Sequence, residues 1–304
     1  MSAHPSLSSV DAVTASLADH DYLADRGLAT TIFLAASLNR PLLLEGEAGV
    51  GKTEVAKVLA AMTGAELIRL QCYEGIDANQ ALYEWNYTAQ LLHLRTAEAT
   101  GTTTAAGADK LEEELFSERF LVRRPLLRAI DHGGSIPPVL LIDEVDRADD
   151  EFEAFLLEAL SDFSITIPEL GTFTAEVPPL VIITSNRTRD VHDALKRRAL
   201  HHWVDHPDFE REVAIVRAKA PAVPERLARQ TAMATGIVRE LGMYKPPGVA
   251  ETLDWANAMH LLGETELTEE TVDATLGTLL KYREDQDKVR REGLKHLLAA
   301  VASA

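Results

Sequence analysis

The sequence lacks the usual marks of a secreted, membrane-spanning or disulfide-stabilised protein. It contains one cysteine, Cys72, which excludes an intramolecular disulfide, favours a reducing compartment and is expected to be a small buried hydrophobe. The longest apolar stretches, such as 32–38 and 139–142, are too short to cross a membrane. The first twenty residues are polar and include Asp11 and Asp19, so we expect no signal peptide and a cytoplasmic location.

Positive charge is also scarce in this chain. Lysine and arginine number 30 against 48 aspartate and glutamate residues, which gives a formal net charge of −18. Such an acidic balance disfavours phosphate-led binding of DNA or RNA, so no nucleic-acid partner is expected. The rest of the composition is that of a globular protein, and aromatic residues, at 6%, are few.

Short apolar runs in the first two-thirds of the chain predict the buried strands of a parallel sheet. These expected strands are 41–44, 66–71, 139–142 and 180–184. Helical spacing is expected over 25–38, 53–62, 111–130 and 150–160. The first twenty residues are expected to form a loose arm or a short helix, and the low-complexity segment 100–107 a flexible surface loop. The alternating segment 164–177 predicts a hairpin.

Strand signals vanish after Pro207, and the remaining segments have the spacing of helices. The expected helices are 209–219, 224–241, 249–262, 269–282 and 285–299. Thr268 is expected to cap one of them. The sequence therefore predicts an α/β domain with a parallel sheet over residues 1–206, followed by an all-helical domain over 207–304.

Residues 46–53 (GEAGVGKT) match the phosphate-loop pattern G-x-x-x-x-G-K-[ST] at every fixed position. Its glycines let backbone N–H groups point at a phosphate, and the N-terminus of the following helix adds positive potential. Lys52 can reach the β- and γ-phosphates, and the Thr53 hydroxyl can bind Mg²⁺. The expected ATP-binding residues are Gly46, Glu47, Ala48, Gly49, Val50, Gly51, Lys52 and Thr53.

Two acids and an amide follow the later apolar strands. Asp143 and Glu144 end the run 139–142, and Asn186 follows the run 180–184. Asp143 is expected to hold Mg²⁺, directly or through a water, together with Thr53, and Glu144 to orient the attacking water and accept its proton. Asn186 can help to place that water. Acids and amides at strand ends are often only turn residues, but the nearby phosphate loop favours the catalytic interpretation.

A basic pair, Arg197 and Arg198, lies just beyond Asn186. A guanidinium that reaches the γ-phosphate of a neighbouring subunit neutralises charge in the transition state. Basic pairs also commonly cap the C-terminus of a helix. We favour the catalytic interpretation and place Arg198 ahead of Arg197.

Together these motifs resemble the AAA+ superfamily, and more closely the CoxD-like subgroup of its MoxR branch. The resemblance runs from about Leu23 to Met259. It is carried by the segments GEAGVGKT, LLIDEVDRAD, ITIPELGTF, PPLVIITSNRTRDVHDALKRRAL and PPGVAETLDWA. It implies an αβα P-loop core, a helical lid and a homo-oligomeric ring, a hexamer, with ATP and Mg²⁺ at the subunit interfaces.

The resemblance also implies a partner with a von Willebrand factor A (VWA) domain and chaperone-like remodelling of a protein client, often a metalloenzyme in maturation. By the same comparison the hairpin 165–175 is the insertion before sensor 1, Asn186 is sensor 1, and Arg198 is the arginine finger. The stretch 73–87 would lie near an insertion that faces the client. Related ATPases carry an arginine, called sensor 2, near the start of a lid helix. Glu251 occupies the matching position here, and Lys245 is a weak candidate to take the place of that arginine.

Two further clusters have a structural and a functional interpretation. His201, His202 and His206 could form a metal site, but are more simply packing and surface residues. Four aromatic residues could grip a client or pack under a loop, and these are Tyr73, Tyr83, Trp85 and Tyr87. The alternatives to a client-remodelling ATPase are a nucleic-acid motor, which the acidic charge disfavours, and a nucleotide-dependent scaffold with little turnover, which Glu251 keeps open.

Overall fold

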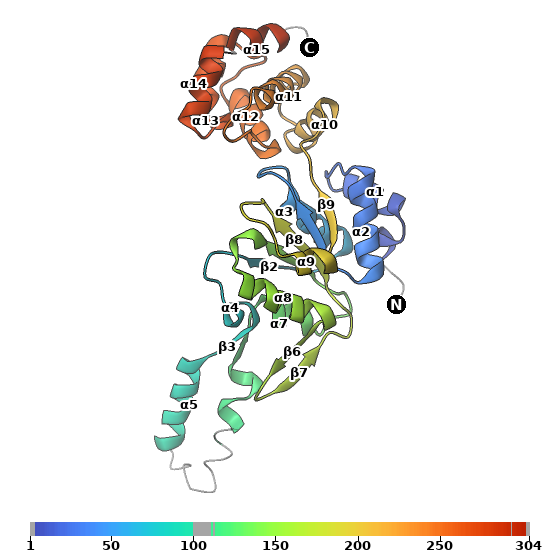
Figure 1. The fold of residues 1–304 in the computed structure, drawn as a ribbon, viewed down its shortest axis with the longest axis vertical. Helices are drawn as coiled ribbons and strands as arrows, with labels where there is room; N and C mark the ends of the chain where they lie inside the picture. The colour runs from blue at the N-terminus through green and yellow to red at the C-terminus, as the bar shows by residue number, and fades with distance from the viewer. Residues whose placement is uncertain (1–3, 100–110, 112, 293, 302–304) are drawn as a thin grey trace.

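The computed structural model describes residues 4–99, 111, 113–292 and 294–301. A five-stranded parallel sheet lies at the centre of the molecule (Figure 1). Its strands are β1 (Leu42–Glu45), β2 (Leu67–Gln71), β5 (Val139–Asp143), β8 (Leu180–Ser185) and β9 (Leu200–Trp203). They are arranged in the order β2-β5-β8-β1-β9, with every pair parallel. The predicted parallel α/β fold is therefore confirmed, and β9 adds a strand that no apolar run had indicated.

The two faces of the sheet bury alternate residues of the same strands, as a period of two requires. Leu42 and Leu44 pack on one face, whereas Leu43 packs on the other. The first face is covered by η1 (Pro5–Leu7), α1 (Val10–Ala18), α2 (Arg26–Leu38) and α3 (Lys52–Thr63). The opposite face is covered by α7 (Pro125–Ile130) and α8 (Asp150–Asp162). The N-terminal segment is thus a packed helix with buried Val13 and Leu17.

Two antiparallel pairs extend from this core. The predicted hairpin is confirmed as β6 (Ser164–Ile167) and β7 (Gly171–Thr174), with Ile165 opposite Phe173. A second pair joins β3 (Tyr83–Trp85) to β4 (Leu121–Arg123) beside α4 (Ala78–Leu82) and α5 (Tyr87–Ala99). Helix α5 projects away from the sheet, at the end of the molecule opposite the C-terminal helices (Figure 1).

The expected helix over 111–130 is wrong for much of its length. Residues 111 and 113–115 are helical, but η2 (Glu118–Phe120) and β4 follow before α7 begins at Pro125. Pro125 occupies the first turn of α7, and the preceding Arg124 is extended, as a residue before proline prefers to be. Residues 121–123 therefore form a strand paired with β3, although the charged pattern of this segment had indicated a helix. The expected flexible loop at 100–107 lies outside the described residues.

The C-terminal region is helical, as the sequence predicted. Its helices are α10 (Phe209–Lys219), α11 (Glu225–Glu240), α12 (Val249–Leu261), α13 (Glu269–Leu279), α14 (Arg283–Glu292) and α15 (Leu294–Val301). They enclose a separate apolar core around the fully buried Trp255. Thr268 caps α13, as predicted. Among the described residues, no helix is long and apolar enough to span a bilayer.

Candidate functional site

The phosphate loop connects β1 to α3 at the carboxyl end of the sheet. Gly49 and Gly51 have φ angles of +79° and +94°, which side-chain-bearing residues rarely adopt. A Cβ at Gly46 would lie 2.4 Å from the carbonyl oxygen of Val204, so this position also needs glycine. Helix α3 begins at Lys52, which places unpaired N–H groups of a helix N-terminus at the end of the loop.

The Lys52 ammonium is held inside this loop. Only 5% of the residue is exposed, and its Nζ donates hydrogen bonds to the carbonyl oxygens of Gly46 at 2.8 Å and Glu47 at 2.6 Å. Burial lowers the pKa of Lys52 to about 8, although the carboxylates of Asp146 and Asp143 oppose this shift. A buried cation of this kind gains strongly from an anionic partner such as a phosphate.

Asp143 connects three elements at the ends of neighbouring strands. Its Oδ1 accepts hydrogen bonds from the Thr53 hydroxyl at 3.0 Å and from the Thr184 hydroxyl at 2.6 Å. Its Oδ2 accepts one from Arg69 at 2.5 Å. A carboxylate beside a threonine hydroxyl is a pair of hard oxygen donors, which is the chemistry that Mg²⁺ prefers, so these residues fit the expected metal.

Glu144 is held on both oxygens of its carboxylate. Asn186 Nδ2 donates to Oε1 at 3.2 Å, and Gln71 Nε2 donates to Oε2 at 3.1 Å. Arg147 adds an ion pair at 3.2 Å. Glu144 itself has a left-handed backbone with φ of +56°, an uncommon conformation for this residue type. The structure therefore brings the predicted pair Glu144 and Asn186 into direct contact.

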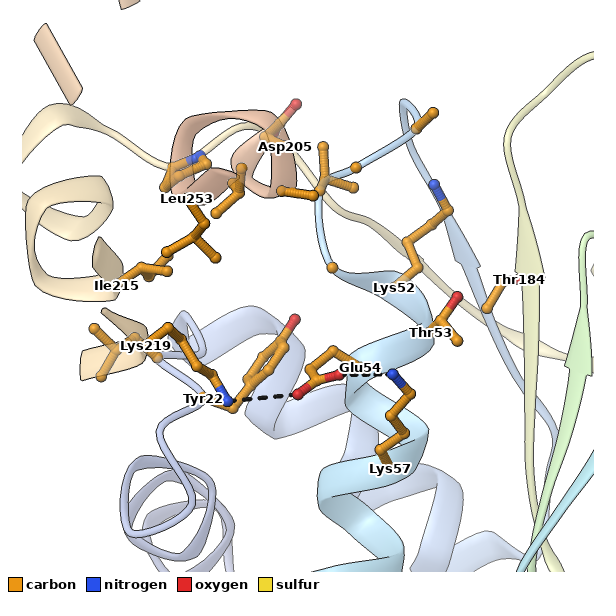
Figure 2. Close-up of a pocket in the computed structure, with 18 of the residues that line it drawn as sticks. Tyr22, Lys52, Thr53, Glu54, Lys57, Thr184, Asp205, Ile215, Lys219 and Leu253 are labelled. Carbon is orange, nitrogen blue, oxygen red and sulfur yellow. Dashed lines mark hydrogen bonds and ion pairs between the residues drawn. The ribbon is translucent and has the colours of Figure 1, made fainter. Parts of the chain in front are cut away.

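These side chains face a cavity of about 470 Å³, a size that suits a nucleotide-sized ligand. Lys52, Thr53 and Thr184 lie on one side of it, and Ile215 and Leu253 from the helical region lie on the other (Figure 2). Tyr22 closes a third side, next to the ion pair between Lys219 and Glu54. The remaining lining residues that the sequence predicted are Ala48, Gly49, Val50, Gly51, Asp143, Glu144 and Asn186.

The two arginines of α9 (Asp193–Arg198) do not line this cavity. Arg198 Nη1 donates to the Leu157 carbonyl oxygen at 3.1 Å and also contacts the Ser161 hydroxyl, so it is tied to α8 of its own chain. Arg197 is exposed, and its guanidinium has no hydrogen bond or ion pair among those found within the described residues.

The residue at the expected sensor 2 position does not line the cavity either. Glu251 is the third residue of α12, and its Oε2 accepts a hydrogen bond from the Gly248 N–H at 3.0 Å. It therefore caps its own helix. Lys245 does not line the cavity either, and its backbone N–H donates to Asp285.

Each of the three histidines pairs with a different carboxylate. His201 contacts Glu45 at 2.9 Å, and His206 contacts Glu47 at 3.2 Å. His202 lies 3.8 Å from an aspartate on the N-terminal side of α2. Within the part of the chain that the structure describes, no group of three or more histidine, cysteine, aspartate or glutamate side chains could hold a metal ion. The packing interpretation of this cluster fits these contacts.

The aromatic cluster divides between packing and exposure. Trp85 is buried and packs edge-on against Tyr83 and Phe116. Tyr87 is 67% exposed, and Tyr73 donates from its hydroxyl to a neighbouring glutamine. Packing under the loop therefore accounts for Trp85, but not for Tyr87.

Sequence reasoning missed several residues that complete the site. Gln71 and Arg69 lie on β2, and Arg147 follows Glu144 in η3 (Val145–Arg147). Parallel pairing places Gln71 directly opposite Asp143. The position of Gln71 at the end of an expected strand was the available signal, because the carboxyl ends of parallel strands meet at one edge of a sheet.

The family model for the AAA domain (dynein-related subfamily) matches residues 41–199, just over half of the chain. This chain belongs to the AAA domain family. The matched segment begins before the phosphate loop and ends after the arginine pair, so it contains Lys52, Thr53, Asp143, Glu144 and Asn186. An AAA domain is a P-loop fold of the ATPase type, which implies nucleotide binding.

Curated relatives of this AAA protein are distant. An uncharacterized protein of Staphylococcus aureus (strain USA300) is 26% identical over 178 residues, which is 56% of this chain and 57% of that protein. One from Staphylococcus epidermidis (strain ATCC 35984) is 23% identical over 197 residues, or 62% and 65% of the two chains. The match thus spans less than two thirds of either relative's length.

Among solved structures, the Thermotoga maritima RuvB Holliday junction branch migration motor aligns with a TM-score of 0.46 at 15% identity. The alignment covers 91% of this chain and 80% of that one. A mutant of Thermotoga maritima RuvB gives the same TM-score at 14% identity, with 97% and 83% covered.

Proposed function

We propose that this AAA protein hydrolyses ATP with Mg²⁺ in the cavity between the sheet and the C-terminal helices. One observation carries the proposal, namely that Lys52, Thr53, Asp143, Glu144 and Asn186 meet at a single cavity although they are far apart in the chain. An ATPase needs all of these groups in one place: a phosphate-binding cation, oxygen ligands for a metal, a base and a polar group to position water.

The contacts suggest a role for each side chain. Lys52 and the loop N–H groups bind the phosphates, while Thr53 and Asp143 are the residues that would hold Mg²⁺. When bound, that ion neutralises charge on the phosphate oxygens. Glu144 orients the attacking water and accepts its proton, and the hydrogen bond from Asn186 fixes one oxygen of this carboxylate.

An arginine from a neighbouring subunit completes the site in this proposal, so the active form is a ring, a hexamer by resemblance. The cavity of a single chain lacks an arginine from α9, and Arg197 is exposed on the surface. Because Arg198 is held by α8, we now place Arg197 ahead of Arg198 as the residue that acts in the neighbour's site.

The finer function rests on the resemblance to the MoxR branch. The ring is proposed to remodel a protein client in metalloenzyme maturation, together with a VWA-domain partner. In this scheme residues 1–206 are the nucleotide-binding core, and residues 207–304 are a lid domain. With a net charge of −18, nucleic acid is not the proposed partner.

The test is the rate of phosphate release from ATP by wild-type protein and by Lys52→Ala. We expect Mg²⁺-dependent turnover from the wild type and severe loss of ATP binding in Lys52→Ala, with circular dichroism showing an unchanged fold. ATP affinity that is identical in the two proteins by calorimetry would exclude the proposed site.

A further inference from the structure

A backbone contact joins the helical region to the phosphate loop. The N–H groups of Val249 and Ala250, the first two residues of α12, donate to the carbonyl oxygen of Gly49 at 3.0 and 3.3 Å. The first N–H groups of a helix have no partner within the helix, so they are available for such a bond. The helix dipole places positive potential at the same end, which favours contact with a carbonyl oxygen.

The contact requires glycine on both sides. A Cβ at Gly248 would lie 2.7 Å from Gly49 Cα and 2.8 Å from the Ala48 carbonyl oxygen. A Cβ at Gly49 would lie 3.1 Å from Gly248 Cα and 2.8 Å from a carboxylate oxygen of Glu251. Most of these neighbours are backbone atoms, which cannot rotate away. Gly248 has a φ of −81°, so close approach and not backbone conformation is what excludes alanine there.

Glu251 positions the end of the helix that makes this contact. Its carboxylate accepts the Gly248 N–H, which leaves the amides of Val249 and Ala250 for the phosphate loop. From α12, the residues that line the cavity are Val249, Ala250 and Leu253. The helix thus touches the loop from outside the cavity through its backbone, and lines the cavity through its apolar side chains.

The hydrogen bonds to the Gly49 carbonyl oxygen also fix the orientation of the peptide group between Gly49 and Val50. In a trans peptide, the carbonyl of one residue and the N–H of the next point in opposite directions. Holding the Gly49 carbonyl against α12 therefore turns the Val50 N–H away from α12, and Val50 lines the cavity. A movement of α12 would change the orientation of a loop amide.

From these contacts we infer that Gly248 and Glu251 are positioning residues through which the helical region sets the geometry of the phosphate loop. The inference rests on the proposed function. In this inference the helical region acts on the phosphate loop through a backbone contact, and not through a side chain that contacts the γ-phosphate. Because the loop binds phosphates common to ATP and ADP, loss of the contact should weaken both nucleotides equally. Loss of a γ-phosphate sensor would weaken ATP alone.

The experiment compares Gly248→Ala with Gly236→Ala, measuring the Kd of ATP and of ADP by calorimetry. Gly236 lies in α11 with nothing within 4 Å of its Cβ position, so it receives the same chemical change without a clash. We expect Gly248→Ala to weaken both nucleotides by about tenfold, the scale of one or two lost backbone hydrogen bonds. Gly236→Ala should bind like the wild type.

Hydrogen exchange provides a second readout that needs no nucleotide. Amides in the first turn of a helix are ordinarily unprotected, so protection at Val249 and Ala250 depends on the Gly49 carbonyl. These amides should exchange slowly in the wild type and in Gly236→Ala, and faster in Gly248→Ala. Glu251→Ala removes the cap without a clash and should weaken ATP and ADP together, while Glu251→Gln, which keeps an acceptor oxygen, should restore binding. These two variants carry the test if Gly248→Ala does not fold.

The outcomes separate the two proposals. Gly248→Ala or Glu251→Ala that binds both nucleotides like the wild type, or that loses affinity for ATP alone, would overturn the inference and leave the proposed function standing. Wild-type protein that binds ATP no better than Lys52→Ala would overturn both.

Discussion

The Thr53 hydroxyl donates a 3.0 Å hydrogen bond to Oδ1 of Asp143, which joins the phosphate loop to the end of β5. The same carboxylate oxygen accepts the Thr184 hydroxyl from β8. Three elements of the core therefore converge on one atom. In the proposed function Asp143 and Thr53 would hold Mg²⁺, so changing either should alter the response to Mg²⁺.

Replacing Thr53 by alanine should raise the Mg²⁺ concentration needed for half-maximal ATP turnover. The expected increase is roughly 10-fold to 100-fold, the usual effect of disturbing a metal site. Asp143→Asn should act in the same direction. Thr30→Ala is the control, because the Thr30 hydroxyl donates to the Arg26 carbonyl oxygen within α2 and lies outside the cavity. A Mg²⁺ titration curve for Thr53→Ala that superimposes on that of the wild type would contradict the assignment.

Arg197→Ala should lower turnover by about 10³-fold or more while leaving the melting temperature unchanged. Mixing it with Lys52→Ala subunits should restore part of the activity, because an interface with a wild-type Lys52 and a wild-type Arg197 can then form. Specific activity of the wild type should rise with protein concentration, because the site is complete only when two subunits associate.

Arg198→Ala is the matched comparison. It removes the contacts with Leu157 and Ser161, so we expect reduced stability and a smaller loss of turnover. Complementation by Arg198→Ala but not by Arg197→Ala would restore the order predicted from the sequence. A concentration-independent rate from a monomer, established by light scattering, would exclude action between subunits.

Cys72 should be unreactive in the folded protein. Burial raises the pKa of its thiol to about 12, and the carboxylate of Asp143 adds to this effect. At pH 8 a thiol-specific reagent should label the unfolded chain at once and the native chain only as it unfolds. Complete labelling of native protein within seconds would contradict this burial.

The same shift predicts a dependence of stability on pH. The folded state keeps the thiol proton at pH values where the unfolded state has lost it, so folding binds protons between about pH 9 and pH 12. The contribution of Cys72 to the free energy of unfolding is therefore present below pH 9 and decreases as the pH rises above it. Denaturant titrations of the wild type and of Cys72→Ala across this range should show a steeper decrease for the wild type.

The fold was predictable where burial leaves a uniform signal in the sequence. Strands β1, β5 and β8 are covered on both faces and appear as continuous apolar runs. Strand β9 contains His201 and His202, and β3 and β4 are three residues each, so none of the three strands gave such a run. Their strand character depends on pairing with distant segments.

The site was predictable where its chemistry lies within one motif. The glycines, Lys52 and Thr53 are close together in the sequence, and the strand-end position of Asp143 and Glu144 follows from a buried run. The contact of Gln71 with Glu144 and the contact of α12 with Gly49 depend on the arrangement of the sheet and of the helical region. A pattern of residue types does not contain that information.

Replacing Glu144 by glutamine tests whether this carboxylate activates water at an ATP site. Glutamine keeps the size of the side chain and an acceptor for Asn186, but it cannot accept the proton from water. Calorimetry and phosphate release should be measured on the same preparation. We expect ATP affinity within about twofold of the wild type and turnover reduced by about 100-fold or more. Wild-type turnover in Glu144→Gln would contradict this role of the carboxylate.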